Sequence, residues 1–235
     1  MAAELKVGGL TPFSATDYPG KLAAVVFVQG CPWRCGYCHN PHLQARTPEG
    51  VMPWRDVLTL LRRRVGLVDA VVFSGGEACM DPQLARAMLD VKQLGFQIGL
   101  HTACIYPQRL NEVLPLVDWV GFDIKAAFAD YRSITRVAGS GNPARDCARA
   151  IIASGVAHEC RTTIHRQLHS EEQLLALAAT LANMGVQDYV LQAFRAEGCN
   201  DASLADDSMI GYPAAATLAQ IGAMFPRFTF RNHAV

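Results

Sequence analysis

The 235-residue sequence lacks an excess of charge of either sign. Its 21 Lys and Arg residues balance 21 Asp and Glu residues, so the formal net charge is zero. Proteins that bind nucleic acid usually carry a strongly basic surface, so this balance argues against nucleic-acid binding as the main function. The one basic run, residues 62–64, stands near the end of a predicted helix, where positive charge complements the helix dipole.

Long apolar segments are also missing. No stretch approaches the roughly 20 apolar residues that a membrane-spanning helix needs, and no low-complexity linker or internal repeat is present. The first ten residues lack the charged segment, apolar run and cleavage site of a signal peptide. We therefore expect a cytoplasmic protein that does not contact a membrane. The hydrophobic content of 51% is enough for a sizeable core, and the length fits one domain over residues 1–235.

Three of the eight cysteines stand close together, in the segment CPWRCGYCHN. Cys31, Cys35 and Cys38 have the spacing CxxxCxxC, which brings three thiolates within reach of one cluster. An iron–sulfur cube ordinarily takes four cysteines, so three would leave one iron open to a small molecule. A zinc site would need a fourth ligand at short spacing, and the adjacent His39 rarely completes a tetrahedron with Cys38. A disulfide would require an oxidising compartment.

The other five cysteines show no repeated CxxC pairing. We expect them to be reduced, mostly buried thiols that pack like small apolar residues, and we expect no second cluster. These residues are Cys79, Cys104, Cys147, Cys160 and Cys199.

Apolar runs of strand length alternate along the chain with helical patterns. The predicted strands cover residues 23–29, 69–76, 96–102, 118–125, 157–165 and 188–194, with a short edge strand over 228–232. The predicted helices cover residues 53–64, 84–94, 107–116, 142–154, 171–184 and 213–224. This alternation predicts an α/β fold with a parallel sheet covered by helices, and six units predict an open, partial (β/α)6 TIM-type barrel. Active groups in such barrels gather at the C-terminal ends of the strands.

Ser74, Gly75, Gly76 and Glu77 stand at the end of the second predicted strand. Two glycines permit a turn with positive φ and a close approach to a ligand. The Glu77 carboxylate could accept hydrogen bonds from an ammonium group, or it could simply be a charge at a helix start. If the backbone contacts a ligand, Gly76→Val should damage ligand binding more than folding.

Polar side chains also alternate along the fifth predicted strand. Arg161, Thr163 and His165 share one face, which we expect to point into the barrel. They could contact a ligand or form a buried polar network that braces the barrel. Gln192 and Arg195, at the end of the sixth strand, are similar candidates.

Several longer segments resemble one known group of proteins. The cysteine motif with its CHNP continuation, the segments FSGGE, VDWVGFDIKA and ECRTTIHRQLHSEEQ, and the N-terminal GGLTPFSATDYPGKLAAVVFVQG carry the resemblance over nearly the whole chain. Together they resemble the radical S-adenosylmethionine (radical SAM) superfamily and, within it, the glycyl-radical enzyme activases. The segments are most similar to the anaerobic ribonucleoside-triphosphate reductase activating proteins.

The resemblance implies a [4Fe–4S] cluster and SAM as cofactors. It implies that Cys31, Cys35 and Cys38 hold the cluster and that the amino and carboxylate groups of SAM chelate the open iron. It also implies SAM-binding roles for the GGE segment and for the aromatic residue between the second and third cysteines, which would lie near the adenine. These residues are Gly75, Gly76, Glu77 and Tyr37.

The Asp-x-Lys pair, Asp123 and Lys125, matches a motif that lies at the SAM site of related activases. There the lysine can pair with the SAM carboxylate, and the aspartate can help to hold a monovalent cation. His101 stands where relatives tend to show aspartate, so it would either replace that charge or hydrogen-bond within the barrel mouth. Arg161 and His165 would be further SAM or substrate contacts.

The implied function is the activation of a partner enzyme. A one-electron donor such as flavodoxin or ferredoxin would reduce the cluster, and SAM would be cleaved to methionine and a 5′-deoxyadenosyl radical. The radical would take a hydrogen atom from a glycine of a glycyl-radical enzyme such as anaerobic ribonucleotide reductase. The alternatives are a radical SAM enzyme that modifies a small molecule or peptide, and an iron–sulfur electron-transfer or binding protein.

Overall fold

One curved sheet of eight strands organises the protein. The computed structural model describes residues 4–199, 201–205 and 209–232. The strands lie in the order β1 to β8; β1 pairs antiparallel with β2, and all later neighbours pair in parallel. Their bounds are β1 Val7–Ser14, β2 Ala23–Val28, β3 Ala70–Gly75, β4 Gln97–Thr102, β5 Trp119–Asp123, β6 Ala157–Ile164, β7 Asp188–Ala193 and β8 Arg227–Arg231.

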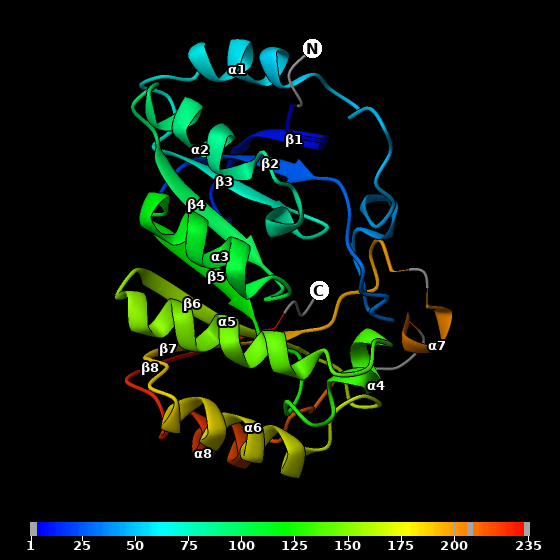
Figure 1. Ribbon diagram of the computed structural model, residues 1–235. Coiled ribbons are helices and arrows are strands. Elements are labelled where there is room, and N and C mark those ends of the chain that lie inside the picture. Colours follow the sequence, from blue (N-terminus) through cyan, green and yellow to red (C-terminus); the bar gives the residue numbers. More distant parts are fainter. Residues whose placement is uncertain (1–3, 200, 206–208, 233–235) are drawn as a thin grey trace.

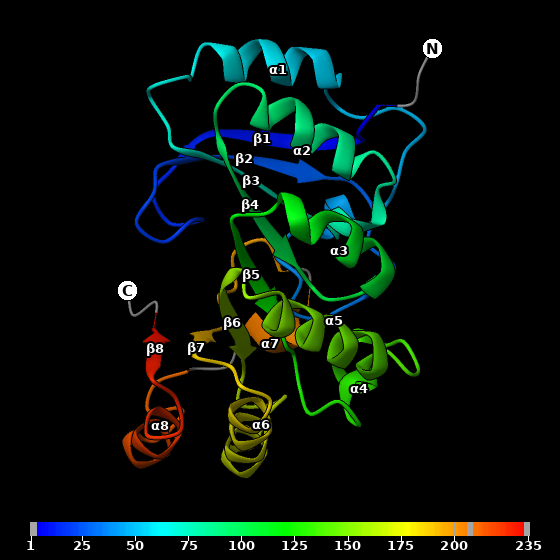
Figure 2. The same ribbon diagram turned by 60° about the vertical axis from the view of Figure 1, so that its left-hand side comes forward.

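Helices connect the parallel strands and cover the outer face of the sheet, as Figures 1 and 2 show. Their bounds are α1 Trp54–Arg62, α2 Leu84–Lys92, α3 Pro107–Val113, α4 Tyr131–Thr135, α5 Gly141–Ser154, α6 Glu171–Asn183, α7 Ala202–Ala205 and α8 Ala215–Gly222. Three 3-10 helices, η1 Pro41–Leu43, η2 Ala78–Met80 and η3 Leu114–Leu116, complete the connections in the described part of the chain.

The two faces of the sheet bury different side chains, because successive strand residues point to opposite sides. Along β2, Ala24 and Val26 belong to the large core shared with the helices, whereas Ala23 and Val25 belong to a smaller cluster on the concave face. Tyr18, from the loop before β2, packs on Trp119 at the start of β5 with ring centroids 5.1 Å apart. This cluster fills the concave face at the N-terminal ends of the strands and leaves the C-terminal ends for polar groups.

The predicted architecture is confirmed: the sheet is mostly parallel, and within the described residues no pairing between β1 and β8 closes it. The sequence analysis missed β1. Its segment VGGLTPFS contains two glycines and a proline, which weaken strands, so β1 depends on its pairing with β2 rather than on local preference. The short helices α4 and α7 were also missed. Within the described residues, no helix is long and apolar enough to cross a membrane.

Candidate functional site

A cavity of about 330 Å³ lies at the C-terminal ends of the strands. Ten of the twelve residues predicted for the site line it: Cys31, Cys35, Tyr37, Cys38, Gly75, Gly76, His101, Asp123, Lys125 and Arg161. Thr163, Gln192 and Arg195, expected with less specific roles, line it as well. Neither Glu77 nor His165 is among the lining residues.

The cysteine loop leaves β2 and is tied at both ends. The N–H groups of Gly30 and Cys31 donate to the carbonyls of Leu43 (2.7 Å) and Gln44 (3.1 Å), which closes the loop at its base. Gly30 has a φ of 103°, in the region that favours glycine. The Arg34 N–H donates to the Thr135 carbonyl (3.0 Å), so the tip of the loop is fixed to the end of α4.

The three motif cysteines are partly buried at the cavity wall. Burial raises the pKa of Cys31 to about 12 and raises that of Cys35, while Lys125 opposes both shifts. A thiolate is therefore costly here unless a cation compensates for it, and a bound metal supplies such a charge. Among the described residues, no three His, Cys, Asp or Glu side chains form a group that could hold a metal ion. That finding concerns side chains that would bind one ion together. It does not bear on an iron–sulfur cluster, because each of three thiolates would bind a different iron.

Asp123 and Lys125 bring opposite charges to the cavity. The Lys125 Nζ lies 3.1 Å from Asp123 Oδ2 and 5.6 Å from the centre of the Tyr37 ring. Burial opposes the charged form of Lys125, yet its pKa is raised because Tyr37, Asp123 and Cys35 surround the ammonium. The Tyr37 hydroxyl is buried and has no hydrogen-bond partner among the described residues. Burial raises the pKa of Tyr37, so this hydroxyl is neutral.

Gly75 and Gly76 run against the backbone that leads into the cysteine loop. Gly75 has a φ of 120°. A Cβ on Gly76 would stand 2.4 Å from the Gly30 carbonyl oxygen and 2.9 Å from that of Leu43. Both glycines are thus required by the packing of β3 beside the loop. Because the added side chain of Gly76→Val would meet main-chain atoms, we expect this substitution to damage folding as well as ligand binding.

The Glu77 carboxylate is buried and turned away from the cavity. It accepts hydrogen bonds from the N–H groups of Cys79 (3.0 Å) and Ala103 (2.8 Å) and from the Thr102 hydroxyl (2.9 Å). Burial raises the pKa of Glu77, although these hydrogen bonds oppose the shift. Its carboxylate therefore joins the ends of β3 and β4, and its contact with an ammonium group stays a prediction.

His101 lies inside the barrel between a loop and an arginine. Its Nε2 stands 2.9 Å from the Asp17 carbonyl oxygen and 3.3 Å from Arg161 Nη2, and its Nδ1 stands 3.4 Å from Ser74 Oγ. Since a carbonyl only accepts, the contact with Asp17 requires a proton on Nε2. Burial, followed by the charge of Arg161, lowers the pKa of His101 to about 4. The ring is therefore neutral and holds the 15–21 loop at the cavity.

The buried carboxylate of Glu159 fixes the position of Arg161. Its Nε donates to Glu159 Oε1 (2.7 Å), and Arg231 of β8 donates to the second oxygen of the same carboxylate (2.7 Å). Its guanidinium lies over the Trp119 ring at 5.2 Å from the centroid. Arg161 thus belongs to a buried polar network, one of the two alternatives for this strand face. Arg161 and Thr163 also line the cavity, so contact with a ligand stays a prediction.

His165 does not reach the cavity. It follows the end of β6, is fully buried, and its Nε2 lies 3.1 Å from the Leu204 carbonyl oxygen. Its ring meets that of Phe194 edge-on at 5.2 Å. The strand ends at Ile164, so the alternation of faces that predicted a lumen position stops one residue earlier.

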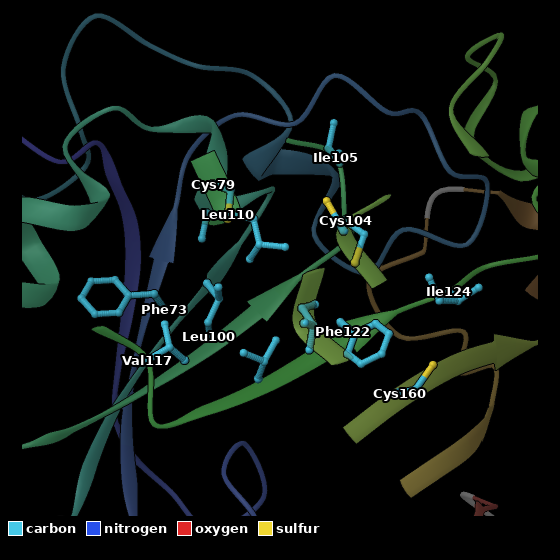
Figure 3. Packing of buried hydrophobic residues seen from close by; sticks show 14 of the residues in the cluster. Phe73, Cys79, Leu100, Cys104, Ile105, Leu110, Val117, Phe122, Ile124 and Cys160 are labelled. Atoms are coloured by element: carbon cyan, nitrogen blue, oxygen red, sulfur yellow. The ribbon is translucent and has the colours of Figure 1, made fainter. Parts of the chain in front are cut away.

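Asp17, Trp33, Asn40 and Thr102 line the cavity but were not predicted to do so. No local pattern marks Asp17, because it enters the cavity through the β1–β2 connection. Among the remaining cysteines, Cys79, Cys104, Cys147 and Cys160 are buried and Cys199 is partly buried. Figure 3 shows Cys79, Cys104 and Cys160 embedded among apolar side chains.

A family model described as the radical SAM superfamily matches residues 25–181 of the chain. The chain belongs to the radical SAM superfamily.

Curated relatives of this radical SAM protein share most of its length. It is 30% identical over 206 residues to the pyruvate formate-lyase-activating enzyme of Clostridium pasteurianum, with 83% of the chain and 84% of the relative covered. It is 29% identical over 210 residues to a Methanocaldococcus jannaschii protein whose name places it among glycyl-radical enzyme activating enzymes, with 83% and 82% covered.

Solved structures share the fold. QueE from Escherichia coli aligns over 97% of this chain and 94% of its own, with a TM-score of 0.57 and 16% identity. Streptococcus suis SuiB bound to S-adenosylmethionine aligns over 87% of this chain with a TM-score of 0.66 and 13% identity, and the match spans 48% of the SuiB chain. At these identities the likeness concerns the fold alone.

Radical SAM proteins use a [4Fe–4S] cluster and SAM, and the cavity fits both. Three cysteines at its wall supply thiolate ligands. Lys125 and Asp123 supply a donor and an acceptor for a charged ligand, and the unpartnered Tyr37 hydroxyl is a buried polar group that a ligand or water can satisfy. The volume falls in the usual range of small-molecule sites.

Proposed function

We propose that this protein is a cytoplasmic glycyl-radical enzyme activase. One observation carries the proposal: the CxxxCxxC cysteines, the glycine pair at the end of β3 and the Asp123–Lys125 pair line one cavity. Relatives named as activating enzymes, matched over more than four-fifths of both chains, support the type of reaction. The bound cluster and SAM supply a 5′-deoxyadenosyl radical, and the residues of the chain bind, orient and shield them.

In this proposal Cys31, Cys35 and Cys38 hold the cluster and leave one iron for SAM. Lys125 pairs with the SAM carboxylate, because its ammonium remains charged beside Asp123. Tyr37 covers the Lys125 side of the site.

The main chain of Gly75 and Gly76 lines the cavity and offers polar groups to SAM. His101 and Arg161 contribute a neutral ring and a charge fixed by Glu159. Glu77 is a positioning residue, since its carboxylate is already bonded.

The partner would be a glycyl-radical enzyme, and the segment-level resemblance favours anaerobic ribonucleotide reductase. A reduced flavodoxin or ferredoxin would supply the electron. Gln192, near the end of β7, and the exposed Arg195, just after this strand, offer polar contacts to a glycine-bearing peptide entering the cavity.

The test is electron paramagnetic resonance of the reduced, cluster-loaded protein mixed anaerobically with SAM and candidate glycyl-radical enzymes. We expect a glycyl doublet on the matching partner and one deoxyadenosine formed per radical. SAM cleavage without a partner radical in any candidate would instead favour a radical SAM enzyme that modifies a small molecule or peptide. No SAM cleavage with a reduced cluster would refute both.

A further inference from the structure

A second cavity of about 450 Å³ lies beside the cysteine loop. Cys35 and Cys38 line both this cavity and the one at the strand ends, so this part of the loop separates the two. The second cavity is otherwise lined by polar and small residues of the loop, of the end of α4 and of the segment around α7: Arg34, Gly36, Pro41, Gln44, Arg136, Asp201 and Ser203. Figure 1 shows the loop after β2 descending between α4 and α7.

Two exposed arginines flank the cysteine loop in this cavity. Arg34 Nη1 donates to the carbonyls of Cys31 (2.6 Å) and Trp33 (2.9 Å), so its guanidinium is fixed against the loop while the side chain stays exposed. Arg136 also reaches the loop, where its Nη2 lies 3.8 Å from the position of a Cβ on Gly36.

The backbone holds Arg136 at this place in an unfavourable conformation. Its φ of 61° lies in the left-handed region, which non-glycine residues rarely adopt. The Arg136 N–H donates to the Arg132 carbonyl (3.0 Å), which ends α4, and the neighbouring Thr135 carbonyl accepts from Arg34. One turn therefore places both arginines beside Cys35 and Cys38.

The charge of this surface is positive. Asp201 is the acidic residue among those lining the cavity, and its Oδ2 lies 3.8 Å from Arg136 Nη2, a loose and exposed pair. Such a pair contributes little binding energy, so Arg136 is available to another acidic group. Two cations against one anion leave a net positive face directly over two motif cysteines.

We propose that this surface, formed by Arg34, Arg136 and the outer side of Cys35 and Cys38, docks an acidic one-electron carrier protein. The inference rests on the proposed function, in which the cluster gains one electron and the reduced flavin or iron–sulfur centre of the carrier loses one. SAM and the partner peptide use the cavity at the strand ends, whereas the second cavity reaches the same cysteines from outside. Complementary charge speeds such short-lived encounters, and electron-transfer interfaces are typically small.

The first test measures binding rather than turnover. The affinity of an acidic flavodoxin in its oxidised form for the anaerobic, cluster-loaded protein is determined by titration calorimetry at low and high ionic strength. We expect the wild-type affinity to fall as salt rises, because the charges are exposed. Arg34→Gln combined with Arg136→Gln should weaken binding about tenfold at low salt and flatten the salt dependence.

Two further variants sharpen the result. Arg136→Gln alone should weaken binding about threefold. Within the described part of the chain, the Arg136 side chain donates no hydrogen bond to the cysteine loop that could confound the result. Asp201→Asn should strengthen binding by a similar factor, because it removes the opposing charge while an amide oxygen can still accept from Ser203. The matched control is Arg62→Gln with Arg63→Gln, an equal change in charge at the exposed end of α1.

Equal affinities of the Arg34/Arg136 variant and the Arg62/Arg63 control would overturn the docking surface, as would an unchanged affinity on Arg136→Gln. Photoreduction by a neutral deazaflavin separates this failure from that of the proposed function. If deazaflavin-reduced wild type cleaves no SAM, the proposed function fails and the docking role fails with it. If it cleaves SAM but the arginine variants bind flavodoxin like the control, only the docking surface is refuted.

Discussion

Acidification should destabilise the protein through His101 in a definite pH window. Burial and the nearby Arg161 lower the pKa of this ring to about 4, whereas the unfolded chain titrates near 6.5. The folded state therefore keeps the ring neutral while the unfolded state takes up a proton. The stability due to this group is complete above pH 6.5, falls as the pH decreases toward about 4, and changes no further below that.

The size of the effect follows from the width of the window. Each pH unit inside it removes about 1.4 kcal/mol from the free energy of unfolding. At pH 5 the loss from His101 should be about 2 kcal/mol, and near pH 4 about 3 kcal/mol. His101→Gln keeps an amide N–H that can donate to the Asp17 carbonyl but has no titrating group. On acidification its free energy of unfolding should therefore fall less than that of wild type, by these amounts.

Denaturant unfolding of the anaerobic, cluster-loaded protein at pH 7.5 and pH 5 measures the difference. The comparison uses the change in unfolding free energy between the two pH values, which cancels any fixed cost of the substitution. His42→Gln is the matched control, because it makes the same substitution at a histidine exposed on η1. If His101→Gln loses as much stability on acidification as wild type, the neutral buried ring is refuted.

Three substitutions test the rest of the site. Cys35→Ala should abolish cluster-dependent SAM cleavage, because two thiolates cannot hold the cube. Iron content reports the loss of the cluster and deoxyadenosine formation reports SAM cleavage, so retained turnover would contradict the ligand assignment. Gly76→Val should lower the free energy of unfolding by at least about 2 kcal/mol through its clash with the Gly30 carbonyl. Gly9→Val is the control and should cost less, because a Cβ there meets only the Phe27 side chain, at 3.8 Å. Equal denaturation midpoints for the two variants would be inconsistent with the clash. Glu77→Ala should lower the free energy of unfolding by about 3 kcal/mol, because two buried N–H groups and a hydroxyl lose their hydrogen-bond acceptor. A loss under about 1 kcal/mol in urea unfolding would show that those groups find other partners.

Short-range patterns in the sequence were sufficient for the parallel sheet and for the cysteine loop. Buried parallel strands are continuous apolar runs, so β2 to β7 could be located to within about two residues. The three cysteines lie within eight residues, and their spacing alone brings them to one place. The glycine pair marked Gly75 and Gly76 at the end of one strand, whereas Asp123 and Lys125 were marked by the resemblance to known activases. These residues come together because strand ends meet at one edge of a parallel sheet.

Where a side chain points was decided only by the tertiary structure. The sequence around Glu77 is the same whether its carboxylate faces a ligand or the N–H groups of Cys79 and Ala103. The carboxylate binds these N–H groups because β4 packs beside β3. His165 leaves the barrel face because β6 ends one residue earlier. Asp17 and β1 reach the site through an antiparallel pairing that local preferences oppose. Sequence spacing fixes which groups are neighbours along the chain, whereas hydrogen-bond partners far apart in the sequence fix which of them face the cavity.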